Sequence, residues 1–496
     1  MNGQKNLSKS RYLNGMQCPR LLWVAVNDAG RLPPVDAATQ QAFDQGHYVE
    51  ELAHRLYPAG LNLYSDNLSE NLRETKASLP LRQPLFEAGF SVNRLYCRVD
   101  ILNPVGADDW DIIEVKSTTE IRDEHLHDVA FQQYCCKLAG LSVAHCRIMY
   151  LNKDYVKQGE IDPQQLFISE DVTDRLEVFS SGIEERIADM LVSISSEDCP
   201  ESAIGQRCNS PYPCLLQEEC WAHLPEHHVM TLYYGKKLGE ELLGKGILHI
   251  GDIPQDVALN FRQQIQKECV VCGKEHINRR EIRKFLEGLV YPLYFMDFET
   301  FTTAVPIYDG THPYQNIPFQ FSVHAVQRPG AAPQHLSYLA EGKDDPRPAF
   351  LAALKEAIGP QGTVLVYYEP FERSRLKELA EAFPKYRKWI DGILARTVDL
   401  ITPFKDFSYY HPSQKGSASI KKVMPALTDL SYDEMAIAEG EMASLKYMEA
   451  TFKDISAEER QKIHADLLAY CEQDTGGMVR IVEKLVALCT GQLELE

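Results

Sequence analysis

The sequence predicts an α/β protein with two folded domains. Its 496 residues are enough for two or three domains, and a content of 44% hydrophobic and 25% charged residues is typical of a globular protein. Short apolar strands alternate with helical stretches in both halves, which is the pattern of the α/β class. We expect a first domain over residues 1–225, a helical connector over 226–288 and a second domain over 289–496.

The first domain is expected to combine an N-terminal helical region with a sheet. Apolar residues at helical spacing predict a helix over residues 37–57, which carries His47 and Glu50. Residues 85–92 and 95–102 read as a hairpin that turns near Asn93. The elements expected to follow are a strand over 111–116, a helix over 122–139 and a strand over 142–151.

Charged residues interrupt two neighbouring strands of this region. Asp100 closes the apolar alternation of the second strand, and Glu114 and Lys116 share one face of the third, because side chains alternate with period two. Two carboxylates can bind a divalent metal, and a lysine can position or activate water or stabilise charge on an attacked phosphate. The alternative is an exposed, salt-bridged sheet edge. Gln132 on the following helix favours the metal site.

This part of the chain resembles the PD-(D/E)XK nuclease superfamily, and within it the RecB/AddB-like and CRISPR-associated exonuclease group, by the order of Glu50, Asp100, Glu114, Lys116 and Gln132. The resemblance implies a restriction-endonuclease-like fold. It also implies Mg²⁺ or Mn²⁺ held by Glu50, Asp100 and Glu114, with Lys116 and Gln132 as catalytic residues. His47 is an off-register rival of Glu50. The last motif of the group, Gln-x-x-x-Tyr, is only half matched, because Cys136 stands four residues after Gln132.

Three cysteines lie six residues apart in a proline-rich loop, at Cys208, Cys214 and Cys220. This is not the pattern of a core strand or helix, and Cys18 is the candidate fourth ligand of a four-thiolate set. Such a set suits Zn²⁺ or a [4Fe–4S] cluster. One cysteine before the nuclease motifs and three after them resemble the iron–sulfur arrangement of the same group, which implies [4Fe–4S], with zinc as the alternative. The pair Cys269 and Cys272 is expected to be incidental, because no second pair follows at zinc-finger spacing.

In the second domain, an apolar and aromatic run over residues 291–300 ends in two carboxylates. The run predicts a buried strand on which Asp297 and Glu299 point to the same side. Two carboxylates on one face are costly without a counter-charge, and a divalent metal is the usual remedy. Two such metals are the usual means of cutting phosphodiesters. The alternative is a solvated strand end.

The rest of the second domain continues the alternation of strands and helices. The elements expected there are strands over 318–326 and 363–368 and helices over 347–358, 369–382 and 456–473. Tyr470 and Asp474 at the end of the last helix are four residues apart and share a helical face. Asp399 is a further candidate carboxylate near the sheet, for which helix capping is the alternative.

These residues resemble the DEDD exonucleases in their tyrosine-bearing form, which have an RNase H-like sheet and two metals held by four acidic residues. The resemblance implies that Asp297 and Glu299 form the first motif and Asp474 the last, while Tyr470 aligns the attacking water. The middle motif of the family ends in Asp, and Glu372 stands at that position as the expected fourth ligand. The two halves together resemble a bacterial family that joins a RecB-like iron–sulfur nuclease domain to an RNase H-like exonuclease domain.

Charge and hydropathy limit the classes of function. The net charge of −20 argues against a broad non-specific nucleic-acid-binding surface, although metal-binding carboxylates themselves add negative charge. We expect no membrane span, because no run of about 18 apolar residues occurs. The polar stretch Met1–Lys9 lacks the apolar centre of a secretory signal, so a cytoplasmic location is expected.

The sequence thus predicts a metal-dependent nuclease with two sites that hydrolyses phosphodiester bonds of DNA, at single strands or duplex ends, most simply as an exodeoxyribonuclease. DNA is preferred to RNA as the nucleic-acid partner, and the sequence does not identify protein partners. Two alternatives stand beside this prediction. One is a single active nuclease domain with a degenerate nucleic-acid-binding domain, and the other is a non-catalytic iron–sulfur nucleic-acid-binding scaffold.

Overall fold

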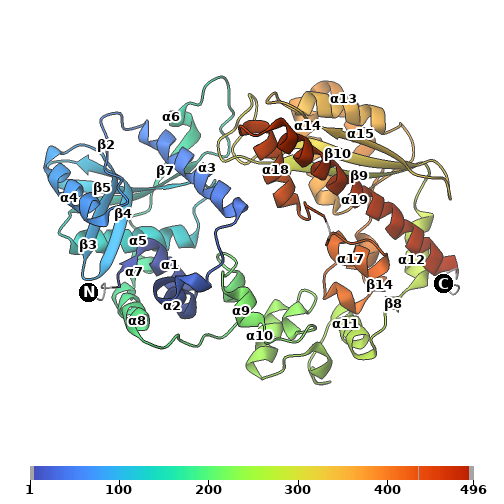
Figure 1. Ribbon diagram of the computed structural model, residues 1–496, viewed down its shortest axis with the longest axis horizontal. Helices are drawn as coiled ribbons and strands as arrows, with labels where there is room; N and C mark the ends of the chain where they lie inside the picture. The colour runs from blue at the N-terminus through green and yellow to red at the C-terminus, as the bar shows by residue number, and fades with distance from the viewer. Residues whose placement is uncertain (1–4, 434, 491–496) are drawn as a thin grey trace. The chain divides into compact units, whose positions relative to one another are not determined.

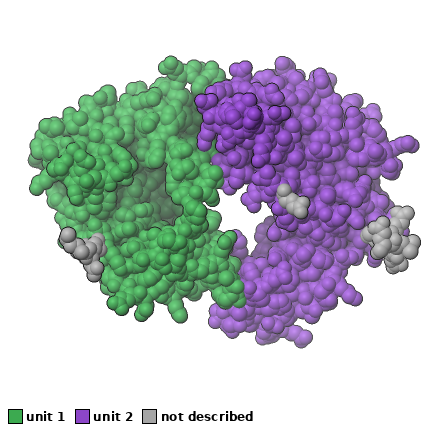
Figure 2. Space-filling model, in the orientation of Figure 1, with its two compact units in different colours: residues 1–223, 303–315 green, residues 224–302, 316–496 purple. Residues whose placement is uncertain are grey.

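The structure, a computed structural model, describes residues 5–433 and 435–490 and confirms the α/β class. The chain divides into two compact units, residues 1–223 with 303–315, and residues 224–302 with 316–496 (Figure 2). This division differs from the predicted domains in two respects. Residues 226–288, expected as a separate connector, belong to the second unit, and residues 303–315, expected in the second domain, belong to the first.

The first unit is built on a mixed sheet with the strand order β2-β3-β4-β5-β6-β7, and β1 pairs with β4 (Figure 1). The central pairs β3–β4 and β4–β5 are antiparallel, whereas β5 and β6 are parallel and are connected through helix α5, Asp123–Leu138. The strands are β1 Leu7–Ser8, β2 Leu61–Asn62, β3 Leu85–Val92, β4 Leu95–Val105, β5 Asp109–Lys116, β6 Val143–Leu151 and β7 Phe167–Asp171.

The predicted hairpin of β3 and β4 is confirmed. Its two-residue turn, Asn93 and Arg94, has φ values of 49° and 67°, and Val92 pairs with Leu95 on either side. Positive φ at both turn positions is the geometry that matches the twist of paired strands, and asparagine adopts it more readily than most residues. The turn therefore fixes the register in which β4 carries Asp100 into the sheet.

Helices cover both faces of this sheet. Helix α5 packs with α1 and α8 on one face, where Tyr12, Phe131 and Ile187 share a core with residues of the strands. Helix α3 lies on the other face, where Val49 and Leu52 share a second core with β4 and β5. The helices are α1 Lys9–Gln17, α2 Pro19–Asn27, α3 Ala37–His54, α4 Leu68–Ser78, α5 Asp123–Leu138, α6 Pro163–Leu166, α7 Leu176–Ser180, α8 Ile183–Ser195 and α9 Gln217–Trp221.

The segment 303–315 completes the face of the first unit that α3 covers. Ala304 and Val305 are buried in the same core as α3, and the Ala304 amide donates to Gln45 Oε1 at 2.6 Å. Asp309 forms an ion pair of 2.7 Å with Lys157. The Tyr314 hydroxyl donates to the carbonyl oxygen of Ser117, the residue that follows Lys116. This segment is thus an integral part of the first unit.

The second unit is built on a sheet with the strand order β11-β10-β9-β12-β13 (Figure 1). Strand β10 is antiparallel to both of its neighbours, β11 and β9, and β12 and β13 continue the sheet in parallel with β9. A separate short ladder joins β8 and β14. The strands are β8 His276–Ile277, β9 Leu293–Phe301, β10 Ile317–Val326, β11 Gln334–Leu339, β12 Thr363–Val366, β13 Thr397–Asp399 and β14 Tyr409–Tyr410.

Helices also cover both faces of the second sheet. Phe350, Leu376 and Ile390 from α13, α14 and α15 share a core with β9, β10 and β12. Helices α18 and α19 pack on β9 and β10 from the opposite side. The helices are α10 Lys236–Gly244, α11 Phe261–Cys272, α12 Arg279–Glu287, α13 Arg347–Ala357, α14 Glu369–Ala382, α15 Arg387–Leu394, α16 Thr402–Lys405, α17 Ile420–Leu427, α18 Gly440–Phe452 and α19 Ala457–Thr490.

Helix α19 is longer than the sequence predicted, since it continues past residue 473 to Thr490. Two adjacent glycines, Gly476 and Gly477, did not favour a continued helix. They are tolerated because buried apolar residues follow at helical spacing, among them Ile481 and Leu485. Gly477 also allows a close approach of α17, since a Cβ there would clash with Met424 Sδ. In the described part of the chain, no helix has the length and apolar character needed to cross a bilayer.

Candidate active sites

The first group of polar residues lies on β4, β5 and α5 of the first unit, as the sequence predicted. Asp100 and Glu114 are buried, with 5% and 1% of their surface exposed. Lys116 Nζ lies 2.5 Å from Glu114 Oε1, and Gln132 Nε2 donates to Glu114 Oε2 at 2.6 Å. Asp100 Oδ2 accepts a hydrogen bond of 2.8 Å from the amide of Val115, the residue after Glu114. This bond keeps the carboxylate of Asp100 on β4 close to that of Glu114 on β5.

Asp128 on α5 also belongs to this group, although the sequence analysis did not select it. Its carboxylate lies 2.6 Å from Lys116 Nζ and accepts a hydrogen bond of 3.1 Å from Gln132 Nε2. Asp128 is fully buried at 1% exposure. The available signal was its position four residues before Gln132, because residues four apart share a helical face.

Lys9 is a second residue that the sequence analysis missed. Its Nζ lies 2.8 Å from Glu114 Oε1, 3.5 Å from Asp100 Oδ1 and 3.8 Å from Asp128 Oδ2. Lys9 begins α1 directly after β1, and β1 pairs with β4 through Leu7 and Leu95. The pairing of these two distant segments carries the lysine to the carboxylates.

The electrostatics of this group are dominated by burial and the two lysines. Burial would raise the pKa of Glu114, but Lys116 and Lys9 outweigh it and hold the pKa well below its usual range. Burial and the neighbouring Glu114 raise the pKa of Asp100 well above its usual value. Burial opposes the charge of Lys116, yet Asp128 and Glu114 raise its pKa, so the lysine is a permanent cation at neutral pH.

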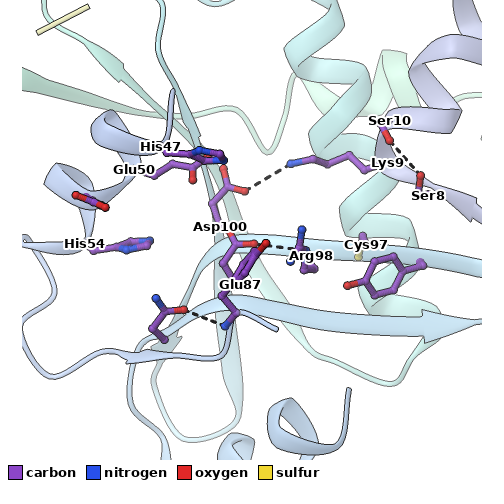
Figure 3. Close-up of a pocket in the computed structure, with 14 residues that line it drawn as sticks. Ser8, Lys9, Ser10, His47, Glu50, His54, Glu87, Cys97, Arg98 and Asp100 are labelled. Atoms are coloured by element: carbon purple, nitrogen blue, oxygen red, sulfur yellow. Dashed lines mark hydrogen bonds and ion pairs between the residues drawn. The ribbon is translucent and has the colours of Figure 1, made fainter. Parts of the chain in front are cut away.

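Glu50 and His47 on α3 lie at the edge of this group. Both line a pocket of about 810 Å³ together with Lys9 and Asp100. Figure 3 shows Lys9 extending toward Asp100, with His47 and Glu50 near the same carboxylate. Burial, followed by the charges of Glu87 and Glu114, raises the pKa of Glu50 to about 7. Glu50, the predicted metal ligand, and His47, the alternative to it, therefore line the same pocket.

The four predicted cysteines gather at the C-terminal end of α1. Burial and the neighbouring thiols of Cys18, Cys208 and Cys220 raise the pKa of Cys214. Gln17 ties this end of α1 to the loop, since its Nε2 donates to the carbonyl oxygens of Arg207 at 3.0 Å and Tyr212 at 2.7 Å. A fifth cysteine, Cys199, packs on the same small core of Leu21, Val24 and Leu216. Cys199 was not among the ligands predicted from the sequence.

The second group lies on β9 and α19 of the second unit. Asp297 and Glu299 share one side of β9, as predicted, and each has an oxygen within 4.8 Å of the other and of Cys471 Sγ. Cys471 Sγ lies 3.7 Å from Asp297 Oδ2. Cys471 was not predicted here, although it stands next to Tyr470 in the motif.

Asp474 is buried and lies beside this pair. Burial, and after it the charge of Asp474, raises the pKa of Asp297 well above its usual value. Asp474 Oδ1 accepts a hydrogen bond from the Tyr432 hydroxyl. Tyr470 lies one turn earlier on α19, and burial and then Asp474 raise its pKa, which keeps the phenol protonated. The Lys421 ammonium lies 5.9 Å from the ring centroids of both tyrosines.

Glu372, the residue at the altered middle motif, points into the same region from α14. It is 2% exposed, and its Oε2 is a buried atom without a hydrogen-bond partner in the described part of the chain. Burial and then the charge of Asp297 raise its pKa well above the usual value. Glu372 lines a pocket of about 470 Å³ with Asp297 and Glu299.

Asp399, the other candidate carboxylate, caps a helix. Its Oδ1 and Oδ2 accept hydrogen bonds from the backbone amides of Tyr368 at 2.9 Å and Glu369 at 3.0 Å. These amides belong to the start of α14, so the cap comes from the neighbouring strand β13 rather than from the helix itself. The cap fixes the helix that presents Glu372.

Known proteins match parts of the chain. Residues 294–419 match the family described as "Domain of unknown function (DUF2779)". An uncharacterised protein of Ureaplasma parvum, UU173, is 26% identical over 51% of this chain and 39% of its own length. The Mycoplasma pneumoniae homolog of the uncharacterised protein MG366 is 24% identical over 40% of this chain and 33% of its own length. The matched regions thus span well under half of these relatives.

Proposed function

We propose that the chain is a metal-dependent nuclease that hydrolyses phosphodiester bonds of DNA at two sites, one in each unit. The observation that carries the proposal is the group of Asp297, Glu299 and Glu372. Carboxylates from two elements meet in one pocket, and a buried oxygen of Glu372 lacks a partner among the described residues. Such a group needs a counter-cation, and oxygen ligands favour Mg²⁺ or Mn²⁺.

In the second unit, Asp297, Glu299, Glu372 and Asp474 would hold the metal. A bound divalent ion supplies charge stabilisation at the phosphate and lowers the pKa of water. Tyr470, protonated at neutral pH, donates a hydrogen bond that orients the attacking water. Lys421, a cation beside Tyr470, attracts the phosphate backbone of the substrate.

In the first unit, Asp100, Glu114 and Glu50 would hold the metal, and Lys116 and Gln132 complete the site. The raised pKa of Lys116 assigns it to the stabilisation of phosphate charge rather than to proton abstraction. Gln132 holds Glu114 through its amide, and its own Oε1 is buried without a partner in the described ranges. That oxygen is available to a water molecule or a substrate group.

The fold supports this proposal. An antiparallel β11-β10-β9 ladder continued by parallel β12 and β13 is compatible with an RNase H-like sheet, and β9 carries the first motif. The first unit places Asp100 and Glu114-x-Lys116 on adjacent strands before α5, as in a PD-(D/E)XK nuclease.

We further propose that Cys18, Cys208, Cys214 and Cys220 hold a [4Fe–4S] cluster. Four thiols are a donor set that fits such a cluster or zinc. One cysteine before the nuclease motifs and three after them, the order that resembles the iron–sulfur group, favour the cluster over zinc. The cluster would fasten α1 to the loop after α8.

A second candidate function is one active unit and one unit that only binds nucleic acid. Lys9 favours it, because its ammonium contacts Glu114 and approaches Asp100 and so competes with a metal in the first unit. On this reading, the second unit alone cleaves DNA, and the first retains it.

A cleavage assay with Mn²⁺ on labelled single- and double-stranded DNA and RNA tests both candidates. Asp100→Asn and Asp297→Asn each remove one site, and the exposed Asp108→Asn and Asp391→Asn are matched controls. Two-site function predicts that each variant loses part of the activity and the double variant loses all. If Asp297→Asn abolishes cleavage and Asp100→Asn leaves it unchanged, only the second unit is an active nuclease. Intact substrates with wild-type protein under every metal tested would refute both.

A further inference from the structure

A group of two histidines and a glutamate lies outside the carboxylate sites. His324 on β10 and His335 on β11 are directly paired across the two strands, and their ring centroids are 4.6 Å apart. Glu472 on α19 approaches from the helix layer, with Oε1 3.5 Å from His335 Nδ1. One ligand atom of each residue lies within 4.8 Å of the other two. Three elements therefore converge on one point.

Two hydroxyl groups orient the imidazoles. Thr475 Oγ1 lies 2.8 Å from His324 Nδ1, and Ser322 Oγ lies 2.9 Å from His335 Nε2. The two hydroxyls are themselves 2.6 Å apart. One nitrogen of each ring is thus held by a hydroxyl, while the other remains for a ligand. Metal-binding histidines are characteristically oriented in this way by a hydrogen bond from their second nitrogen.

The exposure of the group suits an ion that enters from solvent. His324 is 8% exposed, whereas the side chains of His335 and Glu472 are 26% and 53% exposed. The buried histidine anchors the group, and the other two leave coordination positions open to water. Two imidazole nitrogens and one carboxylate favour a transition-metal ion over Mg²⁺ or Ca²⁺, which prefer oxygen ligands.

We propose that His324, His335 and Glu472 bind a divalent transition-metal ion of the zinc type. The ion links the β10–β11 ladder to α19, and Thr475, which orients His324, follows Asp474 directly on that helix. The site stabilises the position of α19 against the sheet. This inference does not depend on the proposed nuclease activity, because the ligands and the measured quantity are different.

Cobalt absorption provides the test, with the full chain as isolated and Mg²⁺ in excess to occupy the carboxylate sites. Co²⁺ bound by imidazole and carboxylate gives visible d–d bands without the thiolate charge-transfer band that cysteine ligands produce. Wild-type protein is expected to bind one Co²⁺ of this kind. His335→Gln, at a partly exposed position, and Glu472→Gln, at an exposed one, should weaken this binding at least about tenfold.

The matched controls are His464→Gln and Glu458→Gln, which change the same residue types on α19 outside the group. Both are expected to bind Co²⁺ as the wild type does. Zn²⁺ should raise the melting temperature of wild type and controls but not of the two ligand variants. Equal Co²⁺ affinity in ligand variants and controls would overturn the site. Loss of Co²⁺ binding with an unchanged Zn²⁺ shift would overturn the stabilising role.

Discussion

Lys9 and Glu114 are joined by an ion pair of 2.8 Å across 105 positions of sequence. Lys9 begins helix α1, and Cys18 directly follows its last residue. A helix of nine residues is about 14 Å long, so one rigid element runs from the carboxylate group to the cysteine group. Any event that displaces the cysteines is expected to move Lys9.

We predict that Lys9→Met tightens Mn²⁺ binding in the first unit about tenfold, because a competing cation is removed. Without divalent metal, the same change should lower the free energy of unfolding by about 3 kcal/mol, since buried carboxylates lose a partner. Mn²⁺ titration by electron paramagnetic resonance in an Asp297→Asn background, together with denaturant unfolding, measures both effects. Lys153→Met, at an exposed position, is the control. Wild-type values in both measurements would contradict this role of Lys9.

The second prediction concerns pH. Burial raises the pKa of Asp474 from its ordinary 3.8 to about 6. The folded state therefore holds this proton more tightly than the unfolded state, and the stabilisation is complete below pH 3.8 and lost as pH rises through about 6. For metal-free protein the loss amounts to about 3 kcal/mol.

Asp474→Asn should remove this part of the pH dependence, and Mn²⁺ should offset it in wild-type protein. Denaturant unfolding between pH 4 and pH 8 measures the effect, with the more exposed Asp466→Asn on the same helix as the control. A pH profile that is identical for wild type and Asp474→Asn would show that the group does not titrate as described.

The third prediction separates two tyrosines of the second unit. Tyr470→Phe should lower kcat about 10²-fold with little change in KM, because it removes the proposed donor to the attacking water and leaves the carboxylates in place. The hydrogen bond from Tyr432 lowers the pKa of Asp474. Tyr432→Phe removes this bond and so raises the pKa of Asp474. It should therefore shift the acidic limb of the pH–rate profile upward. Steady-state kinetics over a range of pH, in an Asp100→Asn background that removes the first site, distinguish the two variants. An unchanged kcat in Tyr470→Phe would contradict the proposed role of Tyr470.

The fourth prediction concerns the cysteines. Protein prepared without oxygen should be brown, and Cys208→Ser should be colourless with a lower melting temperature. Cys272→Ser, at an exposed position on α11, should retain the colour. Cys199→Ser should also retain it, because Cys199 is additional to the four predicted ligands. Colourless wild-type protein with one equivalent of zinc would replace the cluster by a zinc site.

The sequence alone was enough to predict those site residues whose positions depend on local periodicity. Asp100, Glu114 and Lys116 lie together because strands alternate with period two and the hairpin brings neighbours into register. Lys9 could not be found in this way, because its place depends on the pairing of β1 with β4. The length of α19 could not be predicted because Gly477 has a packing reason, the close approach of Met424, that no local pattern reveals.

The segment 303–315 leaves β9 of the second unit, supplies Ala304 and Val305 to the core of the first, and returns as β10. The chain therefore crosses between the units more than once, and a single cut near residue 223 does not yield two complete halves. During synthesis on the ribosome, Ala304 and Val305 follow residue 223 by about 80 positions, so this core of the first unit can be completed only after that stretch has been made. The first unit therefore completes its fold only when part of the second unit has already been synthesised.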